Sequence, residues 1–378
     1  MKTDVITLHT VDNYGSAMQT YATQEVLKKL GCEVEIIDYW RENNLPEHRA
    51  QQMLDTSLMQ KLKPIWGRNH KTETTAIKCM QWYLEHHVSP MWKFLEDNVN
   101  LSKKRYTSFD ELKADPPKAD VYITGSDQVW NSIWNDGIDR SYFLDFAPQD
   151  KPRIAFSASI GRTEFSEDEI SETKALLQKY TAISVREESA VELLKSIGIE
   201  SQLILDPTLM LNCNEWRKVA KGRKKTRPFL LIYQLNPNPE MDQFAMNLAK
   251  KKVWEVIRVG FGRSDRQKPG KCIMSPSVEE FVGLLFQAKC VLTDSFHATA
   301  FSLNLGTDFI SVRPQKFATR IESILQLTGQ EQRLLDDYKD LNIVDRAIDK
   351  KHVKKILDHE RKAGMEWLRE ALGIRGAV

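Results

Sequence analysis

Short β-branched runs alternate with amphipathic segments along much of the chain. Residues 4–10 (DVITLHT) form the first such run, and residues 17–30 then carry apolar side chains at helical spacing as far as Gly31. Residues 33–39 (EVEIIDY) form a second β-branched run. The order strand, helix, strand predicts a βαβ unit, which is the building block of a parallel sheet.

The alternation continues through the first half of the sequence, apart from one long interruption. Residues 47–97 are mostly polar and contain no clear strand, so the stretch of about 41–115 predicts a helical insertion between strands of the first sheet. Beyond it, we expect strands at 121–125, 153–159, 182–186 and 203–207, and helices over 167–179 and 187–197.

A basic segment separates this half from a second one of the same kind. Residues 212–228 (NCNEWRKVAKGRKKTRP) are polar, strongly basic and closed by a proline, which predicts an interdomain linker. After it, we expect strands at 229–235, 253–260, 290–295 and 308–312, and helices near 240–250, over 277–288 and from Phe296.

The two alternations together predict an α/β protein with two Rossmann-like domains, residues 1–211 and 229–345, that face each other across a cleft. Residues 346–378 are expected to form a C-terminal helical segment, with the helix itself at about 345–372 and charges on much of its surface. Its apolar side should pack onto a domain, and a return to the first domain is left open. That side consists of Val353, Ile356, Leu357, Trp367, Leu368 and Leu372.

Composition narrows the classes of function. With 28% charged and 41% hydrophobic residues among 378, the chain is an ordinary globular protein rather than a disordered or fibrous one. Lys and Arg number 54 and Asp and Glu 52, so no bulk charge favours nucleic acid, and any bound anion has to be held locally. Five scattered cysteines fit a reducing compartment, and no apolar run is long enough for a membrane span. We therefore expect a cytoplasmic protein.

Parallel α/β sheets bind ligands at the carboxyl ends of their strands, where loops and helix N-termini meet. The first strand end carries Asn13, Gly15 and Ser16. Gly15 allows a tight turn or a close backbone approach, and Ser16 could cap the following helix so that free N–H groups face an anion or a sugar hydroxyl. A simple strand-to-helix turn explains the same residues equally well.

A second strand end carries Ser126, Asp127 and Gln128 within the sequence GSDQVWN. An aspartate among hydrogen-bonding groups suits a polyhydroxylated substrate, and Asp127 could act as a general base. A capping turn would use Ser126 or Asp127 in the same way.

A third strand end places His297 in the first turn of a helix, after Asp294 and Ser295. A helix N-terminus favours anions and lowers the pKa of an imidazole, which suits a hydrogen bond to phosphate or a proton transfer. The alternative is a structural histidine whose hydrogen bonds are satisfied within the protein.

A fourth strand end carries Arg186, which could hold a carboxylate or a phosphate with two hydrogen bonds. The alternative is an ion pair with Glu187 or Glu188. Arg313 and Arg320 follow the last expected strand and are further candidates for anion binding.

The common cofactor and metal motifs do not occur in the sequence. It contains no GxGxxG, no GxxxxGK[ST], no HExxH and no Cys/His spacing typical of zinc. We therefore expect no metal and no redox cofactor.

The strand-end segments occur in an order that is characteristic of one enzyme family. Through these segments, which lie between about residues 8 and 325, the chain resembles the polysaccharide pyruvyl transferases. GSDQVWN and DSFH are the most specific of them. The full set is NYGSAMQTYATQEVL, ITGSDQVWN, SVREESAVELL, LDPTLML and TDSFHATAFSLNLGTDFI.

The resemblance implies a fold like that of the two-domain GT-B glycosyltransferases, with the active site between the domains. It implies phosphoenolpyruvate as donor and a hydroxyl pair of a sugar or lipid-linked oligosaccharide as acceptor. The products would be a cyclic pyruvate ketal and phosphate, in cell-surface or exopolysaccharide biosynthesis. His297 is then expected as proton donor or phosphate contact, and Asp127 as the group that orients or deprotonates the acceptor hydroxyl. Arg186 and the helix start at Ser295 would hold the donor anion.

One position departs from the family pattern. Where ketal-forming members carry Arg-Leu-His, this chain has Ser295-Phe296-His297, so the histidine is kept and the phosphate-binding arginine is absent. Arg313 or Arg320 could take its place, or the donor could differ.

Two other functions stay open. A GT-B glycosyltransferase that uses a nucleotide sugar would share the architecture, and Glu279–Glu280 could bind its ribose, although a helix start explains this pair better. A non-catalytic sugar-binding protein would use the same strand ends only to bind. The sequence also leaves open the oligomeric state and a contact with the inner face of a membrane, for which the basic run Lys221–Arg227 is either a candidate or a solvated linker.

Overall fold

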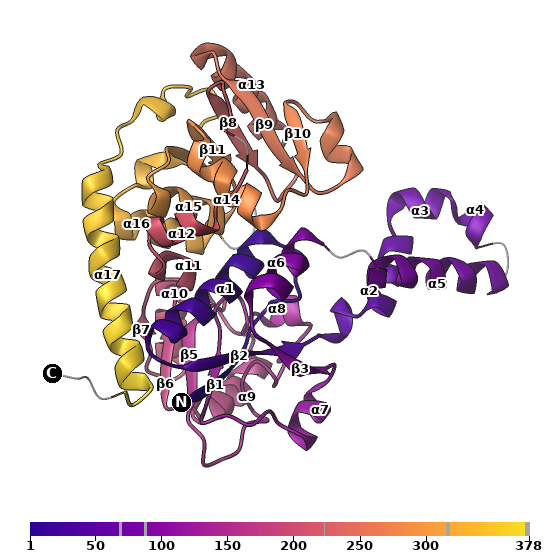
Figure 1. Ribbon diagram of the computed structural model, residues 1–378, viewed down its shortest axis with the longest axis vertical. Coiled ribbons are helices and arrows are strands. Elements are labelled where there is room, and N and C mark those ends of the chain that lie inside the picture. The colour runs from indigo at the N-terminus through magenta and orange to yellow at the C-terminus, as the bar shows by residue number, and fades with distance from the viewer. Residues whose placement is uncertain (68–69, 87–88, 223, 315–317, 375–378) are drawn as a thin grey trace.

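The fold consists of two sheets in which the strand pairs are parallel (Figure 1). The first has the order β3-β2-β1-β4-β5-β6-β7 and the second β10-β9-β8-β11-β12-β13. Both follow the Rossmann order, in which the direction of growth reverses beside the first strand. The predicted α/β class with two Rossmann-like domains is therefore confirmed. The computed structural model describes residues 1–67, 70–86, 89–222, 224–314 and 318–374.

The central strands of both sheets are buried, as expected for parallel strands that are covered on both faces. The strands of the first sheet are β1 Lys2–Ile6, β2 Glu33–Tyr39, β3 Leu101–Tyr106, β4 Val121–Thr124, β5 Arg153–Ala158, β6 Ala182–Val185 and β7 Gln202–Leu203. Those of the second are β8 Phe229–Tyr233, β9 Glu255–Gly260, β10 Lys271–Met274, β11 Cys290–Thr293, β12 Phe309–Val312 and β13 Leu334–Leu335.

The helices of the first half include a group that stands away from both sheets, formed by α2 to α5 (Figure 1). The bounds are α1 Tyr14–Lys29, α2 Pro46–Leu54, α3 Ser57–Lys61, α4 Lys63–Trp66, α5 His70–His86, α6 Pro90–Asn98, α7 Phe109–Ala114, α8 Ser132–Asn135, α9 Glu167–Leu177, α10 Glu188–Ser196, α11 Pro207–Met210 and α12 Cys213–Val219. The stretch of about 41–115, expected to be helical, also contains strand β3. Its sequence LSKKRY is polar because β3 is a half-exposed edge strand.

The helices of the second half pack around the second sheet, and the last of them, α17, also contacts the first half. The bounds are α13 Pro239–Lys252, α14 Val278–Gln287, α15 Phe296–Leu305, α16 Thr319–Thr328 and α17 Lys350–Ala371. Short 3-10 helices in the two halves lie at Glu42–Asn44, Arg263–Gln267, Glu331–Arg333 and Ile343–Asp345. The edge strands β10 and β13 were not expected from the sequence, because β10 is only partly buried and β13 has two residues. The strand expected at 203–207 ends early, because Asp206 caps α11 and Pro207 begins it.

The segment expected as a basic linker, residues 212–228, is anchored to the fold at its beginning. Trp216 of α12 is completely buried and packs against Phe301 with ring centroids 4.6 Å apart. Its indole nitrogen donates to the carbonyl oxygen of Thr208 at 2.8 Å. This segment therefore joins the two halves through packed contacts.

Helix α17 lies along both halves of the molecule (Figure 1). Arg361 donates from Nε to the carbonyl oxygen of Leu209 at 2.7 Å and from Nη2 to Oδ1 of Asn304 at 2.8 Å. Leu209 belongs to α11 and Asn304 to α15. One side chain of the last helix thus links an element of the first half to one of the second.

The largest hydrophobic cluster contains buried residues of both halves, among them Val5 of β1 and Val291 of β11. Where the halves meet, Tyr14 of α1 stacks on Phe281 of α14 with ring centroids 4.3 Å apart. The hydroxyl of Tyr14 donates to the carbonyl oxygen of Pro276 at 2.5 Å. The start of α1 is therefore held against the second sheet's domain.

Candidate active site

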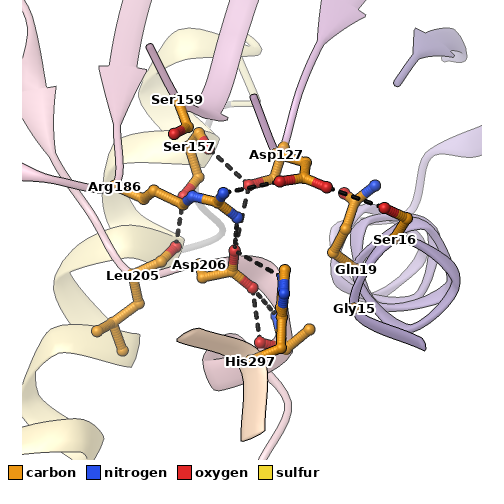
Figure 2. Close-up of polar contacts among 12 residues, drawn as sticks. Gly15, Ser16, Gln19, Asp127, Ser157, Ser159, Arg186, Leu205, Asp206 and His297 are labelled. Atoms are coloured by element: carbon orange, nitrogen blue, oxygen red, sulfur yellow. Dashed lines mark hydrogen bonds and ion pairs between the residues drawn. The ribbon is translucent and has the colours of Figure 1, made fainter. Parts of the chain in front are cut away.

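Three segments that follow the carboxyl ends of strands meet between the two sheets. Gly15 follows β1, Asp127 follows β4, and His297 follows β11. Strands β1 and β4 are neighbours where the order of the first sheet reverses, and β8 and β11 hold the same place in the second. Such switch points are where α/β sheets bind ligands. We call Gly15, Asp127, Arg186, Asp206 and His297 the interdomain cluster (Figure 2).

Arg186 is the centre of the interdomain cluster, and its side chain is completely buried. Nη1 donates to Oδ2 of Asp206 at 2.6 Å, and Nη2 donates to Oδ1 of Asp127 at 2.8 Å. Nε lies 3.7 Å from Oε2 of Glu187. Burial alone would lower the pKa of Arg186, but the three carboxylates outweigh it and hold the pKa above its ordinary value.

The contacts of Arg186 bear on the two roles that the sequence left open for it. We expected it to capture a carboxylate or phosphate of the donor, but both of its Nη groups already donate to protein carboxylates. The geometry supports the ion-pair alternative instead. Glu187 is one of the partners, and Asp127 and Asp206 are closer ones.

Asp127 is also engaged on both of its oxygens. Oδ1 accepts from Arg186, and Oδ2 accepts from Oγ of Ser16 at 3.0 Å (Figure 2). Burial on its own would raise the pKa of Asp127. The nearby positive charges, of which Arg186 has the largest effect, outweigh burial and hold the pKa well below its ordinary value. A carboxylate with so low a pKa is a weak base. The contacts therefore indicate that Asp127 positions Ser16 and Arg186, and its role as a general base stays a prediction.

Asp206 is the member of the cluster that sequence reasoning missed. Oδ1 accepts from the backbone N of Thr208 at 2.9 Å and from its Oγ1 at 2.6 Å. Oδ2 accepts from Arg186. Burial raises the pKa of Asp206, but Arg186 and the other partners lower it further than burial raises it. The sequence Asp-Pro-Thr is a helix-start signal that could have placed Asp206 at a strand end.

His297 reaches the cluster from the second half of the chain and is only 7% exposed. Its ring lies against Gly15, where an added Cβ would stand 2.1 Å from Nδ1. Nε2 lies 3.9 Å from Oδ2 of Asp206 and has no hydrogen-bond partner in the part of the chain that the structure describes. Burial lowers the pKa of His297 to about 4, although Asp206 and Asp127 oppose it. The imidazole is therefore neutral near pH 7, with one ring nitrogen available to a ligand.

Arg320, in the first turn of α16, lies beside the interdomain cluster. Its guanidinium carbon is 5.8 Å from the centroid of the Phe296 ring, and that of Arg186 is 4.9 Å from the same centroid. Among the described residues, Arg320 has no ion-pair partner, and its buried Nε has no hydrogen-bond partner. Burial and then the charge of Arg186 lower the pKa of Arg320 to about 10, so it stays a cation at neutral pH.

Two predicted residues act as helix caps. Asn13, not Ser16, is the N-cap of α1, and its Oδ1 accepts from the backbone N of Gly15 at 2.7 Å. Ser295 is the N-cap of α15, and its Oγ accepts from the backbone N of Ala298 at 3.4 Å. Asn13 thus takes the capping role that was expected of Ser16, which leaves Ser16 to bond Asp127.

Ser126 and Gln128, which flank Asp127 in the sequence, are bonded within their own domain. Oγ of Ser126 donates to the carbonyl oxygen of Ser157 at 2.6 Å. Oε1 of Gln128 accepts from Nδ2 of Asn131 at 2.7 Å. These contacts fix the loop after β4, and their role toward a substrate stays a prediction.

Arg313 lies outside the cluster, on the surface. Its half-exposed side chain donates from Nε to Oε1 of Glu322 at 2.7 Å and from Nη1 to Oδ1 of Asp336 at 2.8 Å. Of the two arginines that could replace the missing family arginine, the structure brings only Arg320 to the cluster.

The pair Glu279–Glu280 forms the start of α14. The backbone N of Glu280 donates to Oγ of Ser277 at 3.2 Å, and Oε2 of Glu280 accepts from the backbone N of Ser277 at 3.1 Å. This capping box supports the interpretation of the pair as a helix start.

Comparison with known families shows to which family the chain belongs. A model of the family described as polysaccharide pyruvyl transferase matches residues 13–315, a range that includes all the members of the interdomain cluster. The chain belongs to the polysaccharide pyruvyl transferase family. This confirms the resemblance found in the strand-end segments and the expectation of a transferase.

Solved structures show the same fold at low sequence identity. A protein named as a UDP-N-acetylglucosamine 2-epimerase from Listeria monocytogenes is 12% identical with a TM-score of 0.55, and the match covers 99% of this chain and 95% of that one. A UDP-GlcNAc 2-epimerase from Neisseria meningitidis, bound to UDP-GlcNAc, is 13% identical with a TM-score of 0.52, over 99% and 100% of the two chains. No curated protein sequence matches the chain. The structural neighbours thus establish the GT-B arrangement of the two domains.

Proposed function

We propose that this family member transfers pyruvate from phosphoenolpyruvate to a pair of sugar hydroxyls, and that the interdomain cluster with Arg320 is its active site. The observation that carries the proposal is the pair His297 and Arg320. One is a neutral imidazole with an unpaired Nε2, and the other is a cation without a counter-ion among the described residues. A small, highly charged donor needs a cation to bind it and a group that moves a proton.

Arg320 is the proposed contact for the donor's anionic groups. Phosphoenolpyruvate carries a phosphate and a carboxylate on three carbons, so a fixed guanidinium can bond either group with two N–H donors. The family arginine is absent at position 295, and Arg320 supplies a positive charge beside the neighbouring Phe296. In this proposal, Arg186 does not touch the donor but holds Asp127 and Asp206 in place.

The reaction is balanced without a further reagent. The methylene carbon C3 of the donor takes up a proton, and one sugar hydroxyl adds to C2 and loses its proton. The bond between C2 and the phosphate oxygen then breaks, and the second hydroxyl adds to C2 and loses its proton. The two hydroxyls release two protons. One balances the proton taken up at C3, and the other is taken up by the departing phosphate.

His297 is the proposed proton carrier. Before the donor binds, a pKa of about 4 keeps the imidazole neutral. The negative charges of a bound donor favour the imidazolium and raise this pKa, so that donor binding itself loads the proton that C3 will receive. The neutral imidazole that remains can accept the proton of the attacking hydroxyl.

The direct test is to incubate the purified protein with phosphoenolpyruvate and a panel of sugars, and to follow the release of inorganic phosphate. We expect release that depends on the acceptor, together with a ketal signal in the NMR spectrum of the product. Transfer of a sugar from a nucleotide sugar would favour a glycosyltransferase instead. Sugar binding without any turnover would favour a non-catalytic sugar-binding protein.

The proposed acceptors are sugars or lipid-linked oligosaccharides of cell-surface or exopolysaccharide biosynthesis, and the proposed location is the cytoplasm, in part at the inner face of the membrane. In the described part of the chain, no helix combines the length and the apolar character that crossing a bilayer requires. Access to a lipid-linked acceptor would therefore need a surface contact with the membrane.

A further inference from the structure

Helices α2 to α5 form an arm, residues 46–67 and 70–86, that stands away from both sheets (Figure 1). None of the cluster residues lies on this arm. At its outer end, the five consecutive residues Lys61–Ile65, where α3 passes into α4, are all exposed. We call these five residues the arm tip. They include Leu62, which is 41% exposed, and Ile65, which is 70% exposed.

The arm tip lies in a strongly basic part of the sequence. Between Thr56 and Thr72 there is no acidic residue, whereas Lys61, Lys63, Arg68 and Lys71 are basic. In the whole chain, by contrast, basic and acidic residues are nearly balanced, at 54 and 52. The tip thus combines local positive charge with exposed aliphatic side chains.

We propose that the arm tip binds the surface of a bilayer that contains anionic lipids. Lys61 and Lys63 are attracted to the headgroups, and Leu62 and Ile65, which alternate with them, can enter the boundary between headgroups and acyl chains. Nucleic acid would attract the lysines but lacks a hydrocarbon layer into which the aliphatic side chains could insert. A second copy of the tip would repel this one, because a symmetric contact brings like charges together. This inference does not depend on which donor the active site uses.

The test is flotation of the full-length protein with vesicles of phosphatidylglycerol and phosphatidylethanolamine, compared with vesicles of phosphatidylcholine. We expect binding to the anionic vesicles that weakens with added salt, and little binding to the neutral ones. Lys61→Gln combined with Lys63→Gln should reduce the partition coefficient by about thirtyfold. Ile65→Gln should reduce it by about tenfold, and Ile65→Leu should restore it.

The matched control is Lys224→Gln combined with Arg227→Gln, which removes two charges from the basic segment at 212–228. This control should bind vesicles like the wild type. The proposal is overturned if the wild type does not bind anionic vesicles, if the control loses binding and the tip variants keep it, or if RNA binds more tightly than the vesicles. It is also overturned if sedimentation shows a dimer that the tip variants convert to a monomer. Thermal melts of all variants establish that they are folded.

Discussion

Arg186 and Arg320 lie beside the same phenylalanine ring, yet their surroundings are opposite. Arg186 donates to Asp206 and Asp127 and lies near a third carboxylate. Arg320 has no such partner among the described residues. Burial on its own lowers the pKa of both arginines. The carboxylates close to Arg186 outweigh this effect, so its pKa is raised, whereas the pKa of Arg320 falls to about 10.

The difference separates an arginine that is paired within the protein from one that is not paired among the described residues. A buried cation is costly unless it is paired, and Arg186 is paired within the protein. Arg320 has no such pairing among the described residues, and in the proposed function the anionic donor supplies it. The first half of the chain thus contributes a closed ion-pair network, and the second half contributes the groups with free bonding capacity, His297 and Arg320.

Replacing Arg186 by alanine should have the largest effect, and the effect should be on stability. It leaves Asp127 and Asp206 buried without their cation, and breaking a buried pair in this way costs about 3–5 kcal/mol. Urea unfolding followed by circular dichroism measures the loss. The stability of Arg186→Lys should lie between that of the wild type and that of the alanine variant, because one ammonium cannot bond both carboxylates in the same geometry. A fully stable alanine variant with weakened donor binding would return Arg186 to the ligand site.

His297→Gln should reduce turnover by about 10²–10⁴-fold, the usual contribution of a positioned acid or base. Glutamine keeps a polar side chain of similar length but cannot carry the proton. The assay is acceptor-dependent phosphate release, and a thermal melt within a few degrees of the wild type shows that the fold is kept. Normal turnover in this variant would exclude His297 as proton carrier.

The stability of the protein should fall as the pH drops from about 6.5 to about 4, and part of that fall should belong to His297. The unfolded chain binds a proton at this histidine below about pH 6.5, whereas the folded chain resists it down to a pKa of about 4. The difference corresponds to a loss on the order of 3 kcal/mol across this window. Urea midpoints at several pH values, compared with those of His297→Gln, isolate this part. Parallel pH profiles for the two proteins would mean that the pKa of His297 is not lowered.

Arg320→Ala should raise the KM for phosphoenolpyruvate by about 10- to 100-fold, because a hydrogen bond to a charged group contributes about 1.5–3 kcal/mol. Stability should stay the same or rise, since the removed cation has no protein counter-ion among the described residues. Arg313→Ala is the matched control. Its ion pairs are on the surface and contribute about 0–1 kcal/mol, so neither KM nor stability should change much. Equal KM values for the two variants would contradict the proposal that Arg320, and not Arg313, contacts the donor.

Gly15→Ala should have the smallest effect, roughly a tenfold loss of turnover, which is about 1.4 kcal/mol. The added methyl group would stand 2.1 Å from Nδ1 of His297, so the ring has to move away from the cluster. Gly262→Ala is the control, because its added methyl group would come no closer than 3.7 Å to another group, which is ordinary contact. If both variants have wild-type turnover, the contact between Gly15 and His297 does not position the imidazole.

Much of the fold could be predicted because its central strands are buried on both faces. Such strands need β-branched residues, and the runs at 33–39, 121–125 and 229–235 all correspond to strands. The edge strands β3, β10 and β13 could not be found in the same way, since an exposed or very short strand carries no such pattern.

The residues that meet between the domains could be predicted from the sequence, whereas their bonding partners could not. The rule that ligands bind at strand ends led to Gly15, Asp127, Arg186 and His297, and the fold brings all four together. Whether an arginine holds a ligand or a protein carboxylate depends on its neighbours in space. The partner Asp206 and the difference between Arg313 and Arg320 therefore became visible only in the structure.

A crystal structure of the protein with phosphoenolpyruvate tests the central claim most directly. The account predicts an oxygen of the phosphate or carboxylate within hydrogen-bonding distance of the Arg320 guanidinium, with Nε2 of His297 facing the donor and Arg186 still bonded to Asp127 and Asp206. A donor bound to Arg186 or to Arg313, with Arg320 left without an anion, would contradict it.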